Sequence, residues 1–310
     1  MEKAFSHIIP EKTRKASLYD YAIGLFPGLE TRSSLKKAVK RGEVYVDGMP
    51  VFSSVRVGAG QKIDWKPGKS AGPVYRMNLD LAFEDDHLLV VNKPAGLVVS
   101  GNRFRTLENA LPAHAKTSAA EDALENPRPV HRLDSLTSGL VIFAKTRQAL
   151  LALGEAMMAR EIEKTYHTVV IGKTPLSGNI QHPIEGAEAL TTYRRLETIP
   201  SLISGTLSVL KVVPLTGRTH QIRIHLSREG FPVLGDKLYG KDGFILKKKG
   251  LFLCATQLSF NHPVSGEKLE ISISPPAKFN RFLEGEKKRW EKYRNSGKNS
   301  GQSLKQQGIE

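Results

Sequence analysis

The chain has 310 residues, 40% of them hydrophobic, so it can form one large domain or two domains with separate cores. Lys and Arg (46) outnumber Asp and Glu (31), and the net charge of +15 indicates a polyanionic partner, most often a nucleic acid, with an acidic membrane surface as the alternative. No apolar run approaches the roughly 18 residues of a membrane-spanning helix, and residues 1–12 are too polar for a signal peptide. The single cysteine, Cys254, excludes an internal disulfide and a multi-cysteine zinc site. We therefore expect a cytoplasmic protein with no membrane partner.

The N-terminal residues predict a small module of two helices followed by strands. Ser17 can cap a first helix that ends at Pro27-Gly28, and Thr31 or Ser33 can start a second helix that ends at Gly42. Short strands are expected at 44–46, 55–57 and 62–65, with a tight turn at 47–48. The second helix carries a basic group made of Arg32, Lys36, Lys37, Lys40 and Arg41.

This basic helix can either follow RNA phosphates or simply face solvent, and its charges alone do not decide between the two. The order of elements, with the basic helix, Gly42, Val44 and the Val46-Asp47-Gly48 turn, resembles the alpha-L RNA-binding domain of a small-subunit ribosomal protein. That resemblance implies an RNA-binding domain at residues 1–65. Residues 66–75, which are rich in proline, glycine and serine, are expected to form a linker.

The next feature is a buried strand at 88–91 that runs into the loop Asn92-Lys93-Pro94-Ala95-Gly96. An ordinary proline-glycine turn is the alternative interpretation of this loop. Residues 115–127 are expected to form a variable loop.

A charged loop followed by a second buried strand lies at the centre of the chain. Residues 139–144 form an apolar run typical of a buried strand, whereas Arg132 and Asp134 just before it would be costly to bury unpaired. Asp134 is thus expected at the end of a buried strand, where rigid neighbours can hold a reactive carboxylate. The alternative is a structural turn, in which Asp and Ser are common.

Further strands and helices are predicted downstream. Thr146 can cap a helix, residues 164–172 alternate as a strand that includes Tyr166, and strands are expected at 191–197 and 206–213. Residues 215–226 alternate tolerably as a strand, but a helix capped by Thr219 and closed by Gly230 is preferred. This helix would carry Arg223, for which an ordinary surface arginine is the alternative interpretation. His220 and His225 are five residues apart without a nearby cysteine or carboxylate, so metal binding is not expected. The polar residues from 285 to 310 predict a disordered basic tail.

Several of these stretches together resemble the RluA-type pseudouridine synthases. The resemblance rests on His131-Arg132-Leu133-Asp134 followed by Thr-Ser-Gly-Leu, and on the later His-Gln-Ile-Arg that ends at Arg223. It extends over roughly residues 80–277 and includes the strand and loop at 88–97. The sequence departs from the usual pattern of that family at Ser100, Ser135, Leu136 and Cys254.

The resemblance implies an α+β fold for residues 76–284, with a mixed, mostly antiparallel sheet and flanking helices. It also implies that Asp134 is the catalytic residue, that Arg223 pairs with its carboxylate, and that Tyr166 stacks on a flipped base. Whether Asp134 would attack C1′ or abstract a sugar proton stays open. No cofactor is expected, because the sequence contains no dinucleotide fingerprint, P-loop or metal cluster. We expect RNA contacts near the site from His131, Arg132, Arg218 and Gln221.

The expected activity is the conversion of uridine to pseudouridine in structured RNA by a monomeric enzyme. Ribosomal RNA of the large subunit is favoured because an added alpha-L domain resembles the arrangement of enzymes that act on it, with transfer RNA as the alternative. A noncatalytic RNA-binding protein is a second interpretation. A third is a hydrolase that uses Ser135 or Ser138 with His131, although the chain has no Gly-x-Ser-x-Gly elbow.

Overall fold

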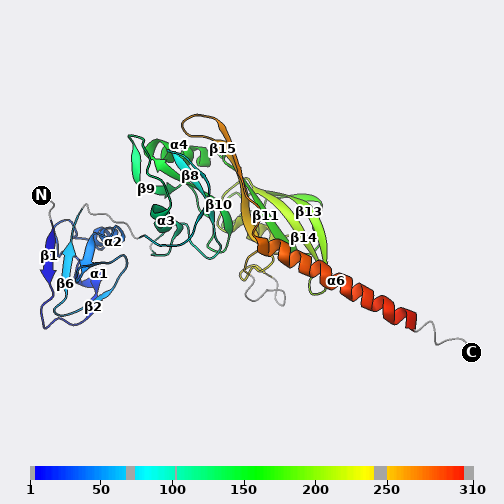
Figure 1. Cartoon of the computed structure of the whole chain (residues 1–310), viewed down its shortest axis with the longest axis horizontal. Helices are drawn as coiled ribbons and strands as arrows, with labels where there is room; N and C mark the ends of the chain where they lie inside the picture. Colours follow the sequence, from blue (N-terminus) through cyan, green and yellow to red (C-terminus); the bar gives the residue numbers. More distant parts are fainter. Residues whose placement is uncertain (1–3, 68–73, 102, 241–249, 304–310) are drawn as a thin grey trace, which may run out of the picture. The chain divides into compact units, whose positions relative to one another are not determined.

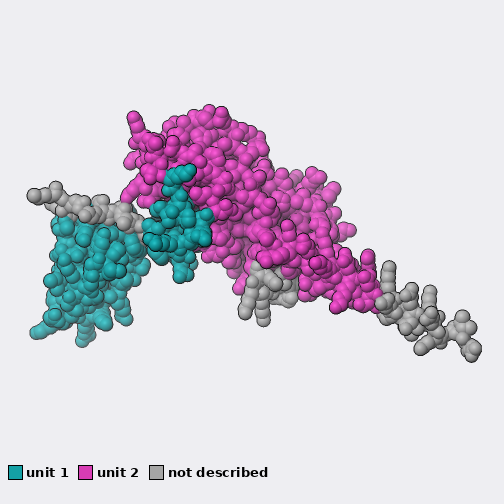
Figure 2. All heavy atoms as spheres, in the orientation of Figure 1, with its two compact units in different colours: residues 1–79, 98–116 teal, residues 80–97, 117–310 magenta. Residues whose placement is uncertain are grey.

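The computed structural model describes residues 4–67, 74–101, 103–240 and 250–303, with side chains up to residue 296. The chain divides into two compact units, residues 1–79 with 98–116 and residues 80–97 with 117–310 (Figure 2). Residues 98–116, expected within the catalytic domain, therefore group with the N-terminal module, to which the Tyr75 amide connects them by donating to the Asn109 carbonyl at 2.8 Å. Most of the expected linker, residues 68–73, lies outside the described residues.

The first unit is built on a small antiparallel sheet with the strand order β1-β6-β3-β4, beside the two-stranded pair β2-β5. Its core contains the apolar side of α2 and the inward residues of the sheet, among them Leu35, Val39, Val44 and Ile63. Its elements are β1 (Phe5–Ile8), β2 (Ala16–Ser17), α1 (Leu18–Tyr21), α2 (Arg32–Lys40), β3 (Val44–Val46), β4 (Met49–Pro50), β5 (Arg56–Val57), β6 (Lys62–Trp65), α3 (Leu107–Ala110) and the 3-10 helix η1 (Leu111–Ala113).

Most of the predicted elements of this unit are present. Thr31 caps α2, where its side chain and that of Ser34 form a reciprocal capping box, and the Asp47-Gly48 turn between β3 and β4 has positive φ at both residues. The first helix is shorter than predicted. Gly24, with φ of +71°, donates its amide to the Leu29 carbonyl, and this turn prevents the helix from continuing to Pro27. Strand β1 was not predicted.

The second unit contains one large sheet with the strand order β12-β13-β14-β11-β15-β10-β8-β7, to which β9 and β16 add at β10 and β15 (Figure 1). Strands β10 and β15 pair in parallel and the other neighbours are antiparallel, so the predicted α+β fold with a mixed, mostly antiparallel sheet is confirmed. Its elements are β7 (Asp80–Glu84), β8 (Leu88–Lys93), β9 (Ala123–Pro129), β10 (Ser138–Thr146), α4 (Arg147–Met158), β11 (Glu163–Ile171), β12 (Ser177–Ile180), β13 (Thr191–Ser201), β14 (Gly205–Pro214), α5 (Gln221–Arg228), β15 (Leu253–Asn261), β16 (Lys268–Ser272) and α6 (Ala277–Ser303).

Strand β10 is buried along its whole length, as its apolar sequence predicts. It begins where the sheet is tightest, because Ser138 and Gly139 pair in parallel with Cys254 and Ala255 of β15. Gly139 has φ of +115°, and a Cβ there would lie 2.1 Å from the Ala255 carbonyl oxygen. Only glycine fits this position without a shift of the backbone. The loop that carries Asp134 leads directly into this fixed point.

Two apolar cores support the sheet. In the first, Ala149 and Leu153 of α4 pack with Leu140 and Ile142 of β10, and Thr146 caps the helix as predicted. The second core joins β11, β14 and β15 to the start of α6, where Phe252 contacts Phe279 and Phe282.

Two expectations of irregular structure are wrong. Residues 123–129, the first of them inside the expected loop, form β9, an outer strand paired with β10, where prolines are tolerated because one edge is free. Residues 285–303, expected to be disordered, continue α6. The Glu, Lys and Arg residues between 286 and 294 favour a helix that is already anchored by the buried Phe279 and Leu283. Residues 304–310 lie outside the described residues.

Candidate active site

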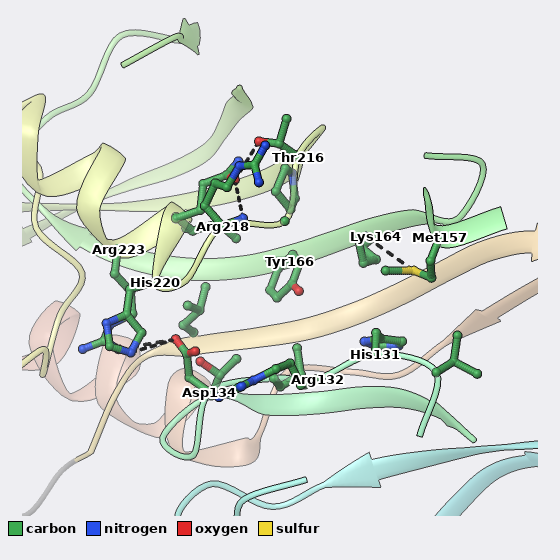
Figure 3. A pocket seen from close by; sticks show the side chains of 18 residues that line it. His131, Arg132, Asp134, Met157, Lys164, Tyr166, Thr216, Arg218, His220 and Arg223 are labelled. Carbon is green, nitrogen blue, oxygen red and sulfur yellow. Dashed lines mark hydrogen bonds and ion pairs between the residues drawn. The ribbon is translucent and has the colours of Figure 1, made fainter. Parts of the chain in front are cut away.

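A cavity of about 300 Å³ opens in the second unit next to Asp134. Its walls come from the 130–137 loop, the start of β11, the 214–218 loop and the first turn of α5 (Figure 3). This volume lies at the lower end of the roughly 300–1,000 Å³ range of small-molecule sites. The Asp134 side chain is 22% exposed, so it can meet a ligand in the cavity while protein covers most of its surface.

Arg223 reaches Asp134 from α5, as predicted. Its Nη1 lies 3.4 Å from Asp134 Oδ2, and its side chain is only 2% exposed, so it is not a surface arginine. Asp236 holds the same guanidinium more closely, because its two carboxylate oxygens accept from Nε at 2.7 Å and from Nη2 at 2.9 Å. The Tyr239 ring also lies 5.1 Å from the guanidinium carbon. Arg223 is therefore fixed by other residues before it meets Asp134.

Arg223 and Asp236 keep each other charged. Burial alone would raise the pKa of Asp236, but hydrogen bonds from Arg223 and from the amides of Leu238 and Tyr239 lower it overall. Burial alone would lower the pKa of Arg223, but the bonds and charge of Asp236, followed by those of Asp134, raise it overall. Arg223 therefore keeps a permanent positive charge beside the Asp134 carboxylate.

Helix α5 begins differently from the prediction. His220, not Thr219, precedes the first helical residue, and it has a left-handed backbone with φ of +55° and no side-chain cap. This conformation directs its ring to the site, where Nε2 lies 3.7 Å from Asp134 Oδ2 and Nδ1 lies 3.0 Å from the Tyr239 hydroxyl. His220 is thus a second nitrogen-bearing neighbour of the carboxylate (Figure 3).

Tyr166 lines the same cavity from β11, near the start of that strand. Its side chain is 9% exposed, and burial, followed by the charge of Asp134, raises the pKa of its phenol. The hydroxyl therefore stays protonated, and the ring presents a neutral surface to the cavity.

Lys93 fixes the loop that carries Asp134 through hydrogen bonds from its side chain. Its fully buried ammonium donates to the carbonyls of Pro94 at 3.0 Å, Leu97 at 2.8 Å and Ser135 at 3.2 Å. The Gly96 amide also donates to Ser135 O, at 2.6 Å. Burial lowers the pKa of Lys93 to about 8, against the opposing effect of Asp134. The backbone of Ser135 makes these bonds, so its departure from the family pattern does not remove them.

The other predicted contact residues at the cavity differ in what they offer RNA. Arg132 is exposed, and Arg218 is exposed with its Nε donating to the Glu188 carbonyl. Burial, followed by the charge of Lys164, lowers the pKa of His131 to about 3, so this ring is neutral. The side-chain amide of Gln221 makes four hydrogen bonds within the protein: its oxygen accepts two and its nitrogen donates two. These four bonds use its full hydrogen-bonding capacity.

Four of the five predicted basic residues lie on α2 and the fifth, Arg41, follows its last residue; all five belong to the first unit and are exposed. Two of them are already paired. Arg32 lies 2.7 Å from Asp20, and Arg41 forms a two-bond contact with Glu43, so these two cations already have partners within the unit. Lys36, Lys37 and Lys40 complete the exposed basic group.

The hydrolase interpretation does not fit the geometry. His131 Nε2 accepts a hydrogen bond from the Ile142 amide at 3.2 Å, so it is occupied by the backbone of β10 and not by a serine. Ser138 is 6% exposed and lies beside Cys254.

Within residues 4–67, 74–101, 103–240 and 250–303, no group of three or more His, Cys, Asp or Glu side chains could hold a metal ion. None of the described helices is long and apolar enough to span a membrane.

Three residues of the site were not among those predicted from the sequence. Asp236 belongs to the stretch Leu234-Gly235-Asp236, which continues the resemblance to the same family after the His-Gln-Ile-Arg motif, and this resemblance was the one available signal for it. His220 gave no signal, because its role depends on a left-handed backbone. Lys93 lies in a loop motif that proline and glycine alone explain.

Known proteins resemble this chain over most of its length. Residues 87–228 match the sequence family described as RNA pseudouridylate synthase. An uncharacterized RNA pseudouridine synthase of Aquifex aeolicus is 34% identical over 80% of this chain and 87% of its own, and a ribosomal large subunit pseudouridine synthase D of Xanthomonas campestris pv. campestris is 32% identical over 91% and 95%. The structure of human RNA Pseudouridylate Synthase Domain Containing 1 superposes with a TM-score of 0.54 and 27% identity, over 64% of this chain and 84% of that one. This chain belongs to the RNA pseudouridylate synthase family and is an enzyme of the isomerase class.

Proposed function

We propose that this enzyme converts uridine to pseudouridine in large-subunit ribosomal RNA, with Asp134 as its catalytic residue. The observation that carries the proposal is the pairing of Asp134 with Arg223 at a cavity, where Asp236 fixes the arginine from the other side. An ionised carboxylate in this position has both the charge and the access that the reaction needs.

The reaction detaches uracil from the sugar, turns it and joins it again through carbon. The C1′–N1 bond breaks, a C1′–C5 bond forms, the proton on C5 leaves and N1 gains a proton, so no atom is lost and no redox step occurs. Asp134 can attack C1′ or take a sugar proton, and either role uses the ionised carboxylate beside Arg223. The Tyr166 ring supports the uracil by stacking while it turns.

The uridine must leave its RNA stack to reach Asp134. Arg132 is exposed two residues before Asp134 and lines the cavity, so it is placed to occupy the space that the base vacates. His131 and Gln221 are engaged with the protein, and we assign them to positioning the loop and α5 rather than to direct RNA contact.

The RNA target is inferred from the relatives and from the first unit. The Xanthomonas relative, which aligns with 91% of this chain, is named for the large ribosomal subunit. The exposed Lys36, Lys37 and Lys40 of α2 can extend the phosphate contacts beyond the target loop, as suits a long structured RNA. We further propose that the enzyme acts as a cytoplasmic monomer.

The target is tested by mapping pseudouridines in total RNA from a strain that lacks this gene and from the same strain with the gene restored. The proposal expects at least one pseudouridine of large-subunit ribosomal RNA to disappear and return. Loss of a transfer RNA site with ribosomal RNA unchanged would show that the target is wrong. If the pseudouridine maps of the two strains are the same and the protein still binds RNA tightly, the noncatalytic alternative is favoured.

A further inference from the structure

A second, larger cavity of about 790 Å³ borders the one at Asp134. It lies between the end of α4, the start of β11 and the open end of the β13–β14 hairpin. We call it the flanking groove. The residues that line both cavities are Met157, Lys164, Pro214, Thr216, Gly217 and Arg218.

Lys164 marks the junction of the two cavities. Its side chain is partly buried, and burial lowers its pKa. In the described part of the chain its ammonium has one recorded hydrogen-bond partner, the Met157 sulfur at 3.9 Å, which is a weak acceptor. Glu163 also lines the groove, but among the described residues it forms no ion pair with Lys164, and its charge acts on Lys268. A partly buried cation without an anionic partner is costly, so Lys164 is prepared to receive an anion.

The rest of the flanking groove combines apolar and basic side chains. Met158 is 80% exposed and Leu215 is 41% exposed, so both present apolar surface to solvent. Arg160 and Arg218 stand at the same side, since both contact Glu188, Arg160 through its carboxylate at 3.0 Å and Arg218 through its carbonyl at 2.9 Å. Grooves that hold single-stranded nucleic acid use cations to follow the backbone and, most often, aromatic side chains to support the bases. Here the cations are present, and the exposed thioether of Met158 offers a soft apolar surface in place of an aromatic ring.

We propose that the flanking groove binds the nucleotide adjacent to the target uridine, with Lys164 holding the phosphate that joins the two. The proposal rests on the function proposed above, because it needs a uridine in the cavity at Asp134. A phosphate connects two neighbouring nucleosides, and Lys164 lies where the two cavities meet, on the far side of Tyr166 from Asp134 in the view of Figure 3. Met158 and Leu215 then contact the neighbouring base without reading its identity.

Kinetics on ribosomal RNA from the strain that lacks the gene test the phosphate contact. Lys164→Met keeps the length and apolar stem of the side chain, and it should raise KM about tenfold, as expected for one lost charge-assisted contact. It should also lower the slope of log KM against log salt by about 0.7, the value for one phosphate of a single strand. Lys164→Arg should restore both values. Lys211→Met, which removes one exposed charge from β14 outside both cavities, is the control and should change neither.

A crosslinking experiment tests the groove without using turnover. Met158→Cys places an exposed thiol in the flanking groove, while the one natural cysteine, Cys254, is buried. A photoactivatable label on that thiol should attach to the nucleotide next to the target uridine. Ile203→Cys is the matched control, because this residue is 65% exposed at the opposite end of the same hairpin and should not give that product.

The outcomes separate the two proposals. If the wild type forms pseudouridine but Lys164→Met changes neither KM nor the salt slope, or the Met158→Cys label attaches only to distant nucleotides, the flanking groove does not bind the neighbour. If the wild type forms no pseudouridine in any RNA fraction, the proposed function itself fails.

Discussion

Asp236 binds Arg223 more tightly than Asp134 does, with bonds of 2.7 and 2.9 Å against one contact of 3.4 Å. The buried carboxylate therefore fixes the arginine, and the arginine in turn presents one nitrogen to the partly exposed carboxylate. This order matters because a guanidinium that is already held costs little to position when substrate arrives.

Asp236→Ala should lower the free energy of unfolding by about 3–5 kcal/mol, because it leaves the Arg223 charge buried with a single distant partner. Asp236→Asn keeps the shape of the side chain but removes its charge. Its main effect should therefore be a lower kcat, with a smaller loss of stability than in Asp236→Ala. Urea unfolding and single-turnover rates measure the two effects. Glu270→Ala removes half of an exposed ion pair on β16 and should leave both nearly unchanged. An Asp236→Asn enzyme with wild-type kcat would show that this carboxylate does not position Arg223.

Gly139→Ala should destabilise the second unit, because the residue has φ of +115° and the new methyl group would meet the Ala255 carbonyl. The backbone strain alone costs about 1–3 kcal/mol. Gly154→Ala is the matched control within α4, where the methyl group would meet no heavy atom within 4 Å and should add about 1 kcal/mol of stability. Thermal unfolding of both variants checks the prediction, and equal melting temperatures would contradict it.

The sequence predicts the centre of this enzyme well because the signals there are local. The apolar run of β10 predicts a buried strand, and the charges just before it place Asp134 at its end. Thr146 and Thr31 cap α4 and α2 as their positions suggest. Each of these elements depends on residues within a few positions of each other.

What the sequence does not predict depends on distant contacts. Arg223 and Asp134 are 89 residues apart, and residues alone describe Arg223 equally well as a surface arginine. Strand β9 contains two prolines, which suggest a loop. It forms a strand because it pairs with β10 along one edge. The composition of residues 285–303 is that of a disordered segment, but the buried Phe279 and Leu283 anchor the helix that continues into it.

His131 should make stability depend on pH. Its pKa is about 3 in the folded enzyme, because of burial, and near 6.5 when unfolded, so the unfolded chain binds more protons between these values. Stability should therefore fall as pH decreases from about 6.5 towards 3, with a contribution of up to about 1.4 kcal/mol per pH unit. His131→Gln keeps an acceptor for the Ile142 amide but does not titrate, so its urea midpoint should fall less steeply. Parallel curves for the two proteins would contradict the assignment.

Tyr166→Phe should retain RNA binding, since the phenol stays protonated and the ring supplies the stacking surface. Tyr166→Leu fills much of the same space without an aromatic face, and it should weaken binding of the flipped base by about 1–3 kcal/mol. Fluorescence titration with substrate RNA compares the two variants, after urea unfolding has shown that both are folded. Equal affinities for the two would mean that the ring does not stack.

The most direct test of the enzyme's mechanism is the pseudouridine yield of Asp134→Asn on ribosomal RNA from the strain that lacks the gene. We predict no detectable pseudouridine and RNA affinity close to that of the wild type, because basic side chains supply most of the binding free energy. Glu125→Gln, which changes an exposed carboxylate on β9, should behave like the wild type in both measurements. Turnover by Asp134→Asn at a rate near that of the wild type would contradict the assignment of Asp134 as the catalytic residue.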